Sequence, residues 1–172
     1  MPTTHRSKRG AKSRSRLPEA LQMLKDDHER VKSMFDDFRK AESPEEKESL
    51  AERICDDLSL HAELEEACFY PAIREAIDEE ELVNEADVEH ATAKDLIAKI
   101  QGCDATDAHF SAMVTVLGEV VKHHIGEEEG EIFGQVKKAD LDLEALAERI
   151  QEFKRDAGVR EDEGAEMGGD ED

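Results

Sequence analysis

The sequence has few aromatic residues and no tryptophan: aromatic side chains make up 4% of its 172 residues. This composition disfavours β-sandwiches, whose strands are rich in aromatic and β-branched side chains. No apolar run approaches the roughly 18 residues that a transmembrane helix needs. The first residues also lack the apolar core of a secretory signal. These features predict an all-α protein with no membrane association.

Cysteine is also scarce, and basic residues are far fewer than acidic ones. Cys55, Cys68 and Cys103 are an odd number without paired spacing, which indicates free thiols in a reducing compartment, and we expect the cytoplasm. The chain has 45 acidic and 23 basic residues, for a net charge of −22. Such a charge repels DNA and anionic membranes, so nucleic acid is not an expected partner.

The charge is distributed unevenly along the chain. Residues 1–16 contain six basic residues and no acid, and we predict a disordered basic arm, with a nucleic-acid contact or a transit peptide as less favoured alternatives. Residues 157–172 are rich in acid and glycine and are predicted to form a disordered acidic tail. Between these tails we expect a helical bundle over residues 17–137 and an appended amphipathic helix over residues 138–156.

Apolar residues recur every three or four positions between the tails, as on one face of an amphipathic helix. The predicted helices begin near Leu17, Ser43, Glu79, Thr106 and Leu141. Pro71 is expected to kink or end the second helix. Because the connections are short, successive helices should be antiparallel. We therefore predict an up-down-up-down four-helix bundle with one short appended helix.

Each bundle helix also places a histidine on its apolar face. Two helices add a glutamate four residues later, in the segments His61-Ala-Glu-Leu-Glu65 and His124-Ile-Gly-Glu-Glu128. This spacing puts both side chains on the same face of a helix. A glutamate buried without a partner is unfavourable, so it is usually paired or bound to metal.

The two predicted helical hairpins repeat one design, at an offset of 62 or 63 residues. The equivalent residues are Asp27 and Glu89, His28 and His90, Lys32 and Lys94, His61 and His124, Glu65 and Glu128, and Glu66 and Glu129. The positions midway between successive histidines fall beside predicted turns. All four histidines should therefore meet at one level of the bundle core.

Four imidazoles and two carboxylates exceed the ligands of one structural zinc ion. Mixed histidine and carboxylate ligation in a bundle core suits a pair of iron or manganese ions. Two histidines for each ion and two bridging glutamates would give each ion four protein bonds. Positions would remain open for solvent, oxygen or peroxide.

The order of a lone histidine and a His-x-x-x-Glu motif, occurring twice, resembles the hemerythrin-like, HHE cation-binding domain over about residues 20–137. The resemblance implies an oxo- or hydroxo-bridged non-haem di-iron centre, with manganese less favoured. Carried over position by position, its ligands would be His28, His61, Glu65, His90, His124 and Glu128. Glu65 and Glu128 would be the bridges.

Lys94 departs from the pattern of the oxygen carriers. Oxygen-carrying hemerythrins have a second histidine one turn after the third-helix ligand, at the position of Lys94. In those carriers five histidines bind the two irons, three on one and two on the other, whereas the four histidines of this chain should bind two to each iron. Both irons would then be accessible, which favours reactive chemistry over reversible oxygen carriage.

Residues near the predicted ligands have less specific expected roles. Cys68 shares the ligand face and is expected to be a buried hydrophobe, Tyr70 a packing residue, and Lys94 an outward-pointing side chain. His123 is set aside because the repeat selects His124.

The sequence thus favours a di-iron protein that binds, senses or reacts with a small molecule, namely O₂, peroxide or nitric oxide. One alternative is a binding module for iron handling or oxygen sensing without turnover. Another is a structural bundle whose acidic surface adapts it to salt or to a basic partner. A glycine stripe at Gly126, Gly130 and Gly134 would suit either the appended helix or a second copy of the chain in a homo-oligomer.

Overall fold

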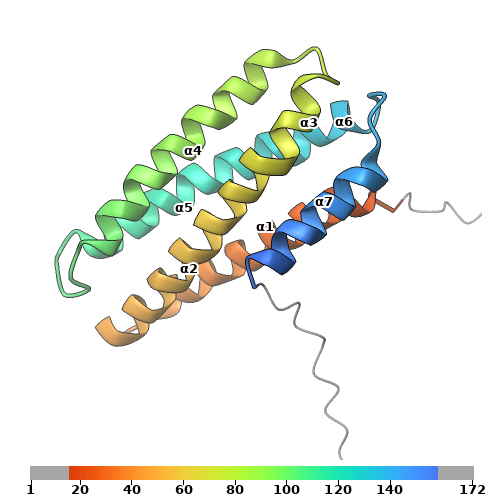
Figure 1. The fold of residues 1–172 in the computed structure, drawn as a ribbon. Coiled ribbons are helices and arrows are strands. Elements are labelled where there is room, and N and C mark those ends of the chain that lie inside the picture. The colour runs from red at the N-terminus through yellow and green to blue at the C-terminus, as the bar shows by residue number, and fades with distance from the viewer. Residues whose placement is uncertain (1–15, 159–172) are drawn as a thin grey trace, which may run out of the picture.

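The structure, a computed structural model, describes residues 16–158. Four long helical stretches run alternately up and down, and a shorter helix lies beside the first of them (Figure 1). The predicted all-α, up-down-up-down bundle with an appended helix is confirmed. The arm predicted for residues 1–16 and the tail predicted for residues 157–172 lie outside the described residues, except at their inner ends.

Two of the four long stretches contain a π-helical segment. The elements are α1 (Glu19–Lys40), α2 (Pro44–Leu64), η1 (Glu65–Phe69), α3 (Tyr70–Arg74), α4 (Glu80–Gln101), α5 (Phe110–Glu127), η2 (Glu128–Ile132), α6 (Phe133–Val136) and α7 (Leu143–Asp156). Helix α2 continues through η1 into α3, and α5 continues through η2 into α6. We call the stretch from α1 to α3 the first hairpin and that from α4 to α6 the second hairpin.

The helix starts follow from local side-chain contacts. The Ser43 hydroxyl accepts a hydrogen bond from the Glu46 backbone N–H, with Pro44 at the first helical position. Helix α5 begins at Phe110, four residues later than the predicted Thr106. The cause is Asp104, whose carboxylate accepts from the Thr106 backbone N–H and holds this segment as a turn.

Each π-helical segment begins at a predicted ligand glutamate. The Glu65 carbonyl accepts from the N–H of Tyr70, five residues on, and the Glu128 carbonyl accepts in the same way from Phe133. Of the two effects expected of Pro71, a kink or an end of the helix, the end does not occur at this residue, since α3 runs through it. Pro71 has no N–H to offer the Ala67 carbonyl, which instead accepts from an Arg149 guanidinium nitrogen of α7 at 3.3 Å.

The hydrophobic core consists of two clusters. One lies where α3, α6 and α7 meet and includes Phe69, Ile73 and Ile150. The other lies toward the opposite end of the bundle and includes Phe38, Ile54 and Leu117. Among residues 16–158, seven polar or charged residues are buried and form a layer in the bundle core: Asp27, His28, His61, Glu65, His90, His124 and Glu128.

Candidate metal centre

The structure brings the six predicted ligands together in the bundle core. Each long helical stretch supplies one histidine, and the two glutamates are the first residues of η1 and η2. All six side chains are buried. Two groups of candidate ligand atoms form, His28 with His61, Glu65 and Glu128, and Glu65 with His90 and His124.

The first group is centred on the Nε2 atoms of His28 and His61, which lie 3.0 Å apart. Oε1 of Glu65 is 2.9 Å from His61 Nε2 and 3.9 Å from His28 Nε2. Oε2 of Glu128 is 3.2 Å from His28 Nε2. Two imidazoles and two carboxylates thus surround one candidate metal position.

The second group is centred on the Nε2 atoms of His90 and His124, 3.3 Å apart. Here Oε2 of Glu65 is the neighbour, at 3.1 Å from His90 and 3.7 Å from His124. Oε2 of Glu128 also lies 3.7 Å from His124 Nε2. The two oxygens of Glu65 face different histidine pairs, which is the geometry of a bridging carboxylate.

Each of the four histidines has its other ring nitrogen, Nδ1, beside a carboxylate. The pairs are His28 with Glu129 at 2.9 Å, His61 with Asp27 at 3.4 Å, His90 with Glu66 at 3.2 Å, and His124 with Glu89 at 2.9 Å. An acceptor at Nδ1 places the proton there and leaves the Nε2 lone pair free. All four Nε2 atoms therefore point into the centre, where each offers a lone pair once its ring is neutral.

These orienting carboxylates come from both hairpins. Asp27 and Glu89 each hold a histidine of their own hairpin. Glu66 of the first hairpin holds His90 of the second, and Glu129 of the second hairpin holds a histidine of the first. Each half of the centre is completed by an acid from the other half.

The donor set fits a pair of metal ions. Oε1 of Glu65 and both carboxylate oxygens of Glu128 are buried without a hydrogen-bond donor. The facing Nε2 atoms carry lone pairs when the rings are neutral, so a bound cation would satisfy both the imidazoles and the carboxylates. Mixed imidazole and carboxylate ligation between facing helices is typical of metal sites in bundle cores.

The pKa values of these groups are shifted because several carboxylates and histidines lie close together in the buried core. Burial works against the charged ring of His28, but contacts with Glu128 and Glu65 raise its pKa to about 10. Burial and the charge of Glu65 raise the pKa of Glu128. Although burial favours its neutral form, His61 and neighbouring histidines hold the pKa of Glu65 well below its usual range. Protons balance the carboxylates in the protein alone, and a bound cation would replace them.

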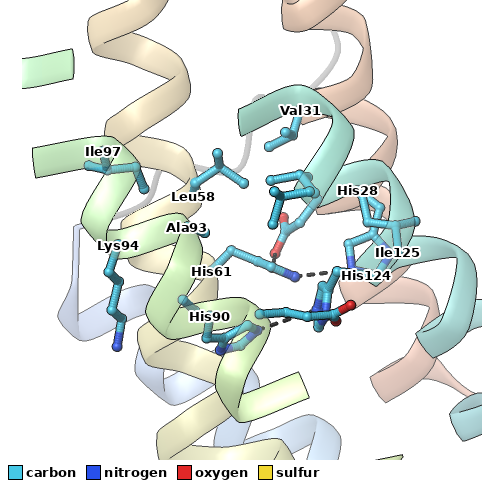
Figure 2. A pocket seen from close by; sticks show the side chains of 15 residues that line it. His28, Val31, Leu58, His61, His90, Ala93, Lys94, Ile97, His124 and Ile125 are labelled. Atoms are coloured by element: carbon cyan, nitrogen blue, oxygen red, sulfur yellow. Dashed lines mark hydrogen bonds and ion pairs between the residues drawn. The ribbon is translucent and has the colours of Figure 1, made fainter. Parts of the chain in front are cut away.

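A small cavity adjoins the histidine layer. Its volume is about 30 Å³, and a cavity needs about 10–15 Å³ to hold one water molecule. Figure 2 shows His61, His90 and His124 beside it, together with apolar side chains that include Leu58 and Ile97. The cavity therefore has room for about two water-sized groups beside the histidines.

Comparison with known protein families gives a match over residues 19–136 to Hemerythrin, the hemerythrin HHE cation-binding domain. The chain belongs to this family. It is also similar to a DNA nickase of Nostoc sp. (strain PCC 7120), with 26% identity over 132 residues. The similarity covers 77% of this chain and 37% of that protein, so the chain spans about a third of the length of its curated relative. No solved structure gives a significant match.

The side chain of Tyr70 has more than the packing role predicted for it in this HHE domain. Its hydroxyl lies 3.4 Å from Oε2 of Glu65 and 3.5 Å from Nε2 of His90. Burial and the charges of Glu65 and Glu128 raise the pKa of Tyr70, so the phenol stays protonated. Tyr70 therefore places an O–H donor at the edge of the centre.

Lys94 and Cys68 lie near the centre but contact other groups. Lys94 is half exposed, and its Nζ is 2.7 Å from Oε1 of Glu66, so it contacts the acid behind His90 and not the centre itself. Cys68 is buried as expected but faces α7, with its sulfur 3.9 Å from the Arg149 carbonyl. The π-helical segment shifts the face on which residues after Glu65 lie.

Sequence reasoning did not identify the four orienting carboxylates. In the sequence, Asp27 and Glu89 are equivalent acids of the internal repeat, and so are Glu66 and Glu129. The repeat alone does not assign them a contact with a histidine. Repetition of an acid beside a predicted ligand was the available signal. Within residues 16–158, no helix is long and apolar enough to span a bilayer.

Proposed function

We propose that this chain is a non-haem di-iron protein whose buried centre binds, senses or reacts with O₂, hydrogen peroxide or nitric oxide. The observation that carries the proposal is the convergence of four Nε2 atoms and three donor-free carboxylate oxygens beside a cavity of about 30 Å³. The proposed ligands are His28, His61, Glu65, His90, His124 and Glu128, with the two glutamates as bridges.

Iron is the favoured metal because the donors are all imidazole and carboxylate. Structural zinc prefers four ligands in a closed tetrahedral site, often with thiolates, and manganese is the second choice. When bound, a pair of iron ions would supply a change of oxidation state and open positions for a small ligand.

The chain's own residues orient the donors, exclude water and hold one proton. The carboxylates at Nδ1 fix the imidazole rings. Apolar side chains such as Leu58 and Ile97 keep the cavity small and dry. The Tyr70 hydroxyl keeps a proton beside Glu65 and His90 at the edge of the centre.

Two observations favour reaction over reversible carriage. The four histidines divide evenly between the two candidate positions, so neither ion would be fully enclosed by protein ligands. Lys94 does not reach the centre as a fifth nitrogen donor, because its ammonium is held by Glu66. The alternative is an iron-handling or oxygen-sensing module without turnover.

The relative's name, DNA nickase, is not carried over to this chain. The match covers 37% of that protein, and the net charge of −22 opposes binding to the phosphate backbone. Nucleic acid is therefore not a proposed partner.

Metal content and an optical spectrum test the proposal. Protein expressed with iron should hold about two iron ions per chain. It should also show oxo-bridged di-iron absorption that changes with O₂ or peroxide. Exposed His109, which lies beside Asp107, provides a control: His109→Ala should keep its iron. Fewer than about one iron per chain, or full retention after His61→Ala with Glu65→Ala, would overturn the proposal.

Peroxide consumption separates an enzyme from a binding module. The iron-loaded protein should decompose peroxide faster than the same concentration of free iron. Turnover no greater than that of free iron would instead support the iron-handling or sensing alternative.

A further inference from the structure

A second, exposed group of candidate ligands lies directly outside the buried centre. Oε2 of Glu89 is 2.9 Å from His124 Nδ1, while Oε1 of the same carboxylate is 3.4 Å from Nε2 of His123. Oε1 of Glu127, one turn after His123, is 3.2 Å from that same Nε2. The three ligand atoms all lie within 4.8 Å of one another.

The spacing of these atoms matches a metal site. Atoms bound tetrahedrally at 2.0–2.1 Å from one ion lie about 3.3 Å from each other. The two distances from His123 Nε2 agree with that value. Glu89 is held in place by its bond to His124, and its side chain is only 17% exposed. His123 is 66% exposed and open to solvent, so an ion can enter and water can complete its coordination.

The internal repeat supplies an independent reason to expect a cation here. Asp27 is the counterpart of Glu89, and its outward oxygen lies 2.8 Å from Nζ of Lys154 on α7 and 3.2 Å from an Arg30 guanidinium nitrogen. Within residues 16–158, no lysine or arginine lies within ion-pair distance of Glu89, and Thr92 is the counterpart of Arg30. Basic side chains of Arg30 and of α7 thus face Asp27, whereas a histidine and a glutamate face Glu89.

We propose that Glu89, His123 and Glu127 bind a divalent first-row transition metal, with Zn²⁺ the best match. One imidazole and two carboxylates suit this class of ion, and water would fill the fourth position. The site does not depend on iron in the buried centre. Glu89 contacts both His124 and the outer site. An ion bound at the outer site would therefore weaken the hydrogen bond from the His124 N–H to Glu89, and this change would reach the buried centre through His124.

Zinc binding to wild type and His123→Ala tests the outer site. Calorimetric titration and metal analysis after dialysis should show one more equivalent of Zn²⁺ in the wild type than in the variant. Loss of one of three ligands should weaken the outer site roughly tenfold or more. Circular dichroism should be the same for both proteins, because His123 is exposed and makes no core contact.

His109→Ala is the matched control, since His109 is also exposed and also lies beside an acid, Asp107. It should bind Zn²⁺ like the wild type, and Glu127→Gln should weaken the outer site. Equal stoichiometry and affinity in wild type and His123→Ala would overturn the proposal. The comparison between variants is valid whether or not the buried centre holds iron, so this result is separate from the test of the di-iron proposal.

Discussion

Glu129 shows how a residue outside the proposed ligand set acts on the centre. Its carboxylate lies 2.9 Å from Nδ1 of His28 and fixes the direction of that ring. We expect Glu129→Ala to lower iron affinity by roughly 10- to 100-fold, measured by competition with a chelator. Glu131 is exposed in the same π-helical segment, and Glu131→Ala should leave the affinity unchanged. An equal loss in both variants would indicate a general effect of charge.

The hydroxyl of Tyr70 can be removed without changing the ring. Tyr70→Phe should lower the free energy of unfolding by about 1 kcal/mol, the usual value of one hydrogen bond. Iron content should stay the same, because the hydroxyl lies beside Glu65 and His90 and is not in the proposed ligand set. Thermal unfolding and metal analysis check both points. Loss of iron in this variant would show that the phenol is itself a ligand.

The sequence predicted how six residues converge but not how their surroundings are arranged. Helical spacing and the repeat were enough to place the histidines at one level, because helix geometry is regular. The partner of each Nδ1 depends on which carboxylate oxygen lies within about 3 Å of it, and helix packing sets that distance. Glu66 was therefore visible as a repeated acid, while its contact with His90 across the bundle was not predictable.

At the scale of elements, the π-helical segments were the main feature that the sequence did not reveal. The same residues would continue an ordinary α-helix, and Pro71 suggested a break. In the structure the extra residue in each segment turns the chain, so that Cys68, Phe69 and Tyr70 are all buried in succession. Two such segments at equivalent positions show that the repeat extends to backbone geometry.

The glycine stripe on the second hairpin is open rather than covered by α7. A Cβ added at Gly126 would meet nothing within 4 Å. Gly126→Ala should therefore stabilise the protein by about 0.5–1 kcal/mol, because alanine favours the helix. Thermal unfolding of the variant measures this gain.

Gly118 provides the contrasting position in the same helix, since an added Cβ would lie 3.2 Å from the Phe35 ring. Gly118→Ala should gain less stability than Gly126→Ala, or lose some. If a second copy of the chain packs on the stripe, Gly126→Ala would instead lower stability and shift the molecular mass seen in sedimentation.

At the scale of the whole molecule, the buried polar layer couples metal binding to folding. Donor-free oxygens of Glu65 and Glu128 are costly without a cation. A metal in 1,000-fold excess over its dissociation constant stabilises a protein by about 4 kcal/mol. We expect removal of iron to lower the unfolding temperature by roughly 10 °C and re-addition to restore it. Scanning calorimetry measures this change.

His61→Ala is the control for metal removal, because it lacks one of the proposed ligands. Its unfolding temperature should change much less when a chelator is added. Identical behaviour of the wild type with and without metal would instead favour a structural bundle in which the polar layer binds nothing.

The crossed contacts of Glu66 and Glu129 have a consequence for how the chain is assembled. A single hairpin has two histidines and a glutamate, but the acid behind its lone histidine lies on the other hairpin. Such a hairpin could complete its own site only by exchanging that acid with an identical copy. The architecture is therefore that of a reciprocal dimer within one polypeptide. Because both hairpins belong to one chain, their sequences can differ wherever they do not contact the other hairpin's histidine. The surroundings of two equivalent acids illustrate such a difference: Lys154 lies beside Asp27, and His123 lies beside Glu89.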